Sequence, residues 1–78
     1  MTRLYFPEDP SLDHLRGQAR TLLRKLRDGD ERAAALLAEH HPDPPAAPRL
    51  ADAQLTLARA YGFTSWPDLR RHLDRLVA

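Results

Sequence analysis

Cysteine is absent from this chain of 78 residues, which excludes a disulfide framework, a thiolate nucleophile and cysteine-based zinc or iron–sulfur sites. Isoleucine is also absent and valine occurs once, against fourteen leucines and twelve alanines, so the composition favours helix strongly over sheet. No apolar run approaches the roughly 20 residues of a membrane span, and the first ten residues lack the apolar stretch of a signal peptide. We therefore expect a small cytoplasmic helical domain with no membrane partner.

An excess of charge of either sign is missing as well. Twelve basic and eleven acidic residues leave a net charge of +1, which is not the charge of an obligate nucleic-acid binder. A chain this short forms one domain at most and buries only about 60–65% of the surface that it exposes when unfolded. The core is therefore expected to be small.

The hydrophobic pattern predicts an all-α fold of about four short helices, arranged as two antiparallel helical hairpins. We expect residues 1–9 to form an N-terminal arm and residues 10–78 to form a single helical domain. Within that domain, the first hairpin spans 10–41 and a proline-rich loop spans 42–48. The second hairpin spans 49–78.

The first helix is predicted at about 10–28, opened by Asp9 as cap with Pro10 at the first helical position. Gly29 is the expected left-handed residue at its end. Gly17 lies inside the helix at a cost of roughly 1 kcal/mol relative to alanine, which suggests close approach by another helix or by the arm.

The other helix ends carry similar signals. Asp30 is predicted to cap the second helix. The third is expected to run from near Pro48 or Arg49 to about Tyr61, with Gly62 at its end. Ser65 and an acidic residue three positions later are close to a capping box and open the fourth helix.

Apolar residues at spacings of three and four predict the core. On the third helix, the predicted inner side begins at Leu50. The residues that we expect to form the core are Leu15, Leu22, Leu26, Leu57, Phe63, Trp66, Leu69 and Leu73.

Candidate catalytic and metal-binding residues are sparse. The carboxylates are dispersed and mostly flanked by arginine, which makes them poor general acids. Adjacent histidines such as His40 and His41 point about 100° apart on a helix, and His14 and His72 are expected on the surface. We therefore expect no catalytic site, no metal and no cofactor.

A core this small cannot cover every apolar side chain, so an exposed apolar patch is expected. Its candidate residues are Leu4, Tyr5, Phe6 and Leu55. The corresponding function is a non-enzymatic protein-interaction or adaptor module, with another protein or a second copy of the chain as its partner.

The alternative is a weak DNA- or RNA-binding module. A small residue at position 58 and glycine four positions later give the segment 58–73 the spacing of a helix-turn-helix. Arginines of the first helix form a basic stripe, and further arginines follow on the fourth helix. We expect the two groups to lie on different faces and to pair with carboxylates; they are Arg16, Arg20, Arg24 and Arg27, and Arg70, Arg71 and Arg75.

Two glutamines, Gln18 and Gln54, lie beside the predicted core stripes. For each amide we expect a structural role, a hydrogen bond to the backbone of a loop that would otherwise be buried without a partner, rather than contact with a ligand.

Three segments together resemble a bacterial sequence pattern: residues 12–24, residues 27–42, and Leu50-Ala-Asp-Ala-Gln-Leu-Thr-Leu-Ala-Arg-Ala-Tyr-Gly-Phe-Thr-Ser-Trp-Pro-Asp-Leu. The pattern is similar to the small helical region at the N-terminus of bacterial ankyrin-repeat-containing proteins. A similar module is attached to some glyoxalase-related proteins. The resemblance implies a stand-alone helical interaction module inside a bacterial cell. It supplies no catalytic residues to transfer.

Overall fold

Four helices make up the computed structural model, which describes residues 11–77 and their side chains as far as Arg75. They are α1 (Leu12–Arg27), α2 (Glu31–His40), α3 (Leu50–Ala60) and α4 (Trp66–Val77). The predicted all-α fold is therefore confirmed, and no strand occurs within residues 11–77. The predicted arm lies outside the described residues.

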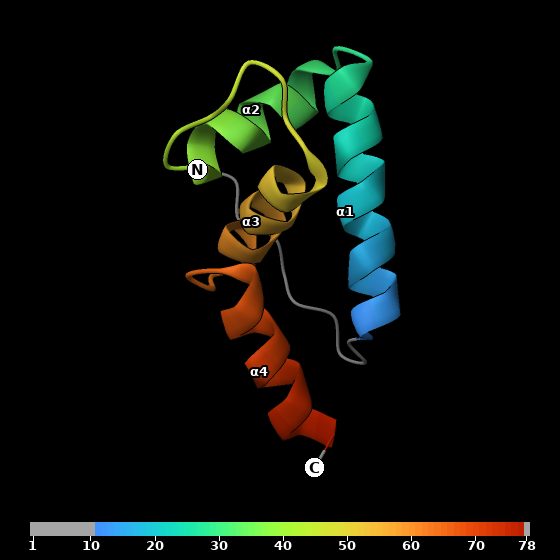
Figure 1. Cartoon of the computed structure of the whole chain (residues 1–78), viewed down its shortest axis with the longest axis vertical. Helices are drawn as coiled ribbons and strands as arrows, with labels where there is room; N and C mark the ends of the chain where they lie inside the picture. The colour runs from blue at the N-terminus through green and yellow to red at the C-terminus, as the bar shows by residue number, and fades with distance from the viewer. Residues whose placement is uncertain (1–10, 78) are drawn as a thin grey trace.

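Short turns join α1 to α2 and α3 to α4, and the proline-rich loop connects the two pairs (Figure 1). At the end of α1, the N–H of Gly29 donates to the carbonyl of Leu26 (3.3 Å) and that of Asp30 to the carbonyl of Lys25 (3.0 Å). Gly29 has φ +79°, and Gly62 has φ +97° after α3. Both predicted glycine caps are confirmed, since this left-handed backbone is strained for any residue with a Cβ.

The observed helix starts agree with the predicted ones in some cases only. Asp30 caps α2 as predicted, because its Oδ1 accepts the N–H of Ala33 at 2.9 Å. The first helix begins at Leu12, two residues later than predicted, with Ser11 as an N-cap that makes no side-chain cap hydrogen bond. The predicted cap Asp9-Pro10 lies outside the described residues.

α3 lies in the middle of the molecule and packs against α1, α2 and α4. Figure 1 looks nearly along its axis, with α1 and α2 around it and α4 leading away. Its buried positions include Ala53, Ala58 and Ala60, whose small side chains let neighbouring helices approach closely. The fully buried hydroxyl of Thr56 donates to the carbonyl of Asp52 at 2.8 Å, so it needs no further partner.

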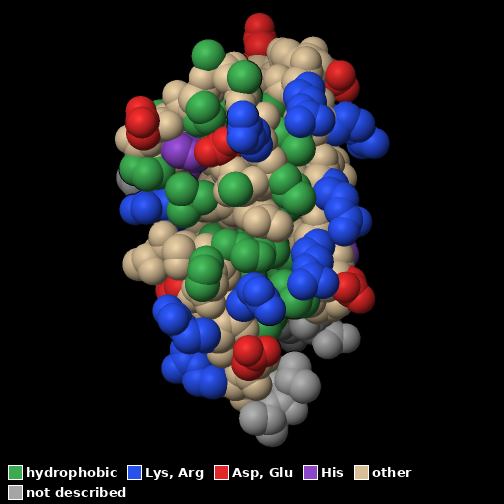
Figure 2. All heavy atoms as spheres, in the orientation of Figure 1, with side chains coloured by type: hydrophobic (Ala, Val, Ile, Leu, Met, Phe, Trp, Pro, Cys, Tyr) green, Lys and Arg blue, Asp and Glu red, His purple; other side chains and the backbone are tan. Residues whose placement is uncertain are grey.

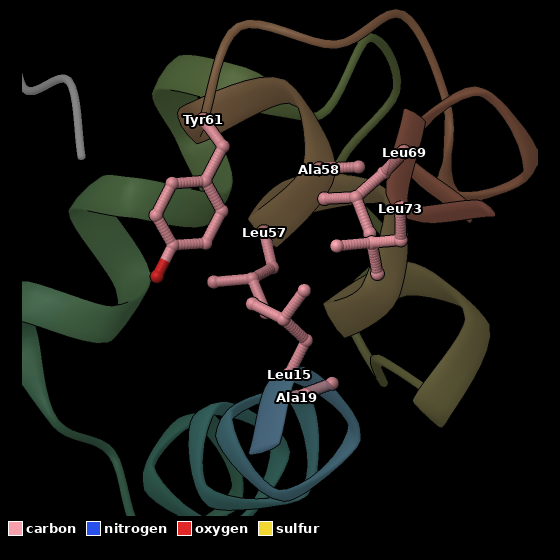
Figure 3. Close-up of a cluster of buried hydrophobic side chains, with 7 residues drawn as sticks. All are labelled: Leu15, Ala19, Leu57, Ala58, Tyr61, Leu69 and Leu73. Carbon is pink, nitrogen blue, oxygen red and sulfur yellow. The ribbon is translucent and has the colours of Figure 1, made fainter. Parts of the chain in front are cut away.

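The larger hydrophobic cluster joins α1, α3 and α4 (Figure 3). Leu15 on α1 and Leu57 on α3 point toward one another, while Leu69 and Leu73 approach from α4. Ala19, Ala58 and Tyr61 complete the cluster. A second cluster between α1, α2 and α3 contains Leu22, Leu23, Ala33 and Ala53.

Five of the eight predicted core residues are buried: Leu15, Leu22, Leu57, Leu69 and Leu73.

The other three pack against the clusters while remaining partly exposed. Phe63 and Trp66 flank the α3–α4 turn, where they cover the rim of the larger cluster, and Leu26 lies at the edge of the second cluster. Leu50 is 39% exposed and not on the inner side of α3, because it is the first residue of that helix.

Candidate interaction surfaces

The described residues do not test the predicted apolar patch as a whole, so it stays a prediction. Leu4, Tyr5 and Phe6 lie outside the described residues. Leu55 is half-buried and therefore offers only part of its side chain. Among the described residues, Leu50 is the large hydrophobic side chain that is exposed. Sequence periodicity missed it, because the pattern does not show where the neighbouring helices end.

A groove of about 570 Å³ runs along one side of α1. The described residues that line it all come from this helix and recur at intervals of three and four: Asp13, His14, Gly17, Gln18, Thr21, Leu22 and Lys25. The groove therefore follows one face of α1 for about three turns, with a carboxylate at one end and an ammonium at the other.

Gly17 lies in the middle of this groove. A Cβ at this position would meet none of the described atoms within 4 Å. Its backbone does not have a positive φ either. Within residues 11–77, neither helix packing nor backbone geometry therefore requires glycine here, although glycine inside a helix costs roughly 1 kcal/mol relative to alanine. The expected close approach by another helix is absent from the described part of the chain.

Gln18 connects the groove to the core. Its Oε1 accepts the hydroxyl of Tyr61 at 2.7 Å, and its Nε2 donates to Nε2 of His14 at 3.2 Å. Gln18 therefore contacts side chains, whereas the sequence predicted a bond to loop backbone. Residues 18 and 61 are far apart in sequence, so no local pattern could indicate this pair. Gln54 is half-buried on α3.

A hydrogen-bonded group joins the proline-rich loop to the start of α3. The N–H of Asp43 donates to Nδ1 of His41 at 3.0 Å, so the neutral ring carries its proton on Nε2. Nε2 then donates to Oδ1 of Asp52 at 2.9 Å. The other carboxylate oxygen of Asp52 accepts the backbone N–H of Arg49 at 2.8 Å. His41 thus holds the loop against the first turn of α3.

Hydrogen bonds at two helix starts lower the pKa of a carboxyl group. The backbone N–H of Arg49, followed by the ring of His41, lowers the pKa of Asp52 below its ordinary value. The backbone N–H of Thr64 and then the side chain of Arg71 lower the pKa of Asp68. The N–H of Asp68 in turn donates to Oγ of Ser65 at 3.3 Å, as the predicted capping pattern requires. Both aspartates are therefore capping carboxylates at helix starts.

The arginines of α1 and α4 were expected on different faces. Figure 2 shows basic side chains along the α1 edge of one face and a second group over α4, with hydrophobic side chains between them. Of the seven arginines predicted from the sequence, all are exposed except Arg16, which is partly buried. With carboxylates in the described part of the chain, two of them make ion pairs: Arg16 with Asp13 (3.7 Å) and Arg71 with Asp68 (3.3 Å).

The histidines do not converge on a metal site in the described part of the chain, where no group of three or more histidine and carboxylate side chains could hold an ion. His72 is half-buried with its ring centre 5.1 Å from that of Phe63, so it is less exposed than predicted. A polar pocket of about 340 Å³ lies where α2 and α3 end and includes His40, His41 and Arg59.

Comparison of the chain with protein-family models, curated proteins and solved structures finds no match. The resemblance to the helical region of ankyrin-repeat proteins therefore stays a prediction. Among the described helices, none has the length and apolar character needed to cross a membrane.

Proposed function

We propose that this chain is a non-enzymatic protein-interaction or adaptor module that binds a protein along the α1 groove. The observation that carries the proposal is Gly17. It lies in the groove, where no described neighbour requires its missing side chain. A partner that approaches the α1 backbone closely would give this glycine a role.

The polar contacts of the fold are consistent with this function. The carboxylates of Asp30, Asp52 and Asp68 accept backbone N–H groups at helix starts, and His41 holds a loop. Tyr61 joins α3 to α1 through Gln18. Each of these groups has a structural role, which leaves surface recognition as the function that the geometry supports best.

Site-specific photocrosslinking in the cells that produce the protein tests the proposal. A photoreactive residue in place of Thr21, which lines the groove, should form a covalent adduct with a protein. The same residue in place of Ala35, which is exposed on α2, is the matched control and should form no such adduct. Absence of an adduct at position 21 would count against the interaction module.

A second candidate is nucleic-acid binding, which Figure 2 favours because basic side chains of α1 and α4 appear on one face. Converging arginines can create a positive local field despite the net charge of +1. Binding of a labelled duplex should then be measurable at about 50 mM salt and weaken steeply by about 200 mM. Replacing Arg70 and Arg71 by alanine should lower both the affinity and its salt dependence.

A further inference from the structure

We propose that the partner in the α1 groove is a second copy of this chain, whose own α1 packs antiparallel to the first across a two-fold axis. This inference rests on the proposed function and names its partner. It follows from the length of the groove, the charges at its ends and the glycine at its centre.

The groove has the dimensions of a helix contact. Asp13 and Lys25 mark its ends, and a rise of 1.5 Å per residue places them about 18 Å apart along α1. The lining residues between them recur at intervals of three and four, as in the contact face of two packed helices. The exposed arginines of α1 are not among the residues that line the groove.

The charges at the two ends favour an antiparallel second copy. A two-fold axis near the middle of α1 places Asp13 against the partner's Lys25, and Lys25 against the partner's Asp13. Both ends of the contact then have opposite charges facing each other. A parallel copy would place like charges together at both ends, which is unfavourable.

The same antiparallel register, in which Asp13 faces the partner's Lys25, also accounts for the glycine at the centre of the groove. Gly17 lies against the partner's Thr21, and Thr21 lies against the partner's Gly17. Helix axes usually pack 8–10 Å apart, and the missing Cβ lets the two backbones approach at the short end of that range. The register thus gives a role to the glycine that the packing within residues 11–77 leaves unexplained.

Sedimentation equilibrium of the full chain tests the inference over about 5–500 µM. One pair of helix faces buries less area than a standard stable interface, so we expect a weak dimer with a dissociation constant of about 10–100 µM. Asp13→Lys or Lys25→Asp alone should raise this constant about tenfold, because each creates two like-charge contacts. Combining the two substitutions should restore wild-type affinity.

Two further variants separate the contact from general effects of charge and folding. Arg70→Asp, at an exposed site on α4, makes the same change of charge as Lys25→Asp and should leave the dimer intact. Gly17→Gln improves helix propensity, so the monomer should remain folded by circular dichroism while the dimer is lost.

A dimer that responds to none of the groove variants would overturn this register while leaving the proposed function standing. A strict monomer up to the highest concentration would overturn the inference, as would a monomer whose own residues 1–9 fill the groove. If Thr21 also fails to crosslink any protein in cells, the proposed function fails with it.

Discussion

The hydrogen bond between Tyr61 and Gln18 should contribute measurably to stability, because it joins α1 to the end of α3. Tyr61 is 8% exposed and its hydroxyl donates to Oε1 of Gln18 at 2.7 Å. Tyr61→Phe keeps the ring and removes the hydroxyl that makes this bond. Gln18 lines an open groove, so water can reach the amide oxygen that remains. We therefore expect a loss of about 1 kcal/mol, the centre of the range for a neutral hydrogen bond.

The corresponding change in melting temperature follows from the size of the chain. An unfolding entropy of about 2.1 cal/mol/K per residue gives about 0.16 kcal/mol/K for 78 residues, so 1 kcal/mol lowers Tm by about 6 °C. Thermal and urea denaturation followed by circular dichroism measure this loss. A double-mutant cycle with Gln18→Met should give a coupling energy of about 0.5–1.5 kcal/mol. A Tyr61→Phe variant that melts within about 2 °C of the wild type would refute the reasoning.

Three further predictions concern caps, pH and the core. Asp30→Ala should destabilise the fold by about 1 kcal/mol in urea denaturation, whereas Ser11→Ala, which removes no side-chain cap bond, should change stability by less than about 0.5 kcal/mol. Because the pKa of Asp52 is lowered in the fold, its stabilising effect is complete above the unfolded pKa and is lost as pH falls through the folded value. Tm should therefore drop below about pH 4, and less steeply in Asp52→Asn; identical pH profiles would contradict this. Leu69→Ala, at a fully buried site, should cost about 2–5 kcal/mol and leave the domain close to unfolding, so a variant with wild-type Tm would contradict the core assignment.

Local chemistry made several of the helix boundaries predictable from the sequence. Gly29 and Gly62 mark helix ends because the left-handed backbone favours glycine. Asp30 and Ser65 mark helix starts because their side chains accept N–H groups that have no partner within the helix.

The sequence could not provide the contacts between elements. The bond from His41 to Asp52 depends on the path of the proline-rich loop, and the bond from Tyr61 to Gln18 depends on how α3 crosses α1. The exposure of Leu50 likewise depends on where the neighbouring helices end. The helical period likewise placed Gly17 on α1. It could not show that a Cβ at this position would contact none of the described atoms.

The position of α1 makes the two candidate functions separable. Its inner face is buried against the other helices, and Lys25 lines the groove whereas the exposed Arg27 does not. A protein partner in the groove should therefore respond to Lys25→Glu and tolerate Arg27→Glu. Phosphates bound to the exposed arginines should respond in the opposite order, because each lost contact reduces counterion release. Since both variants make the same change of charge on the same helix, the order of their effects distinguishes the two functions without requiring the partner to be known.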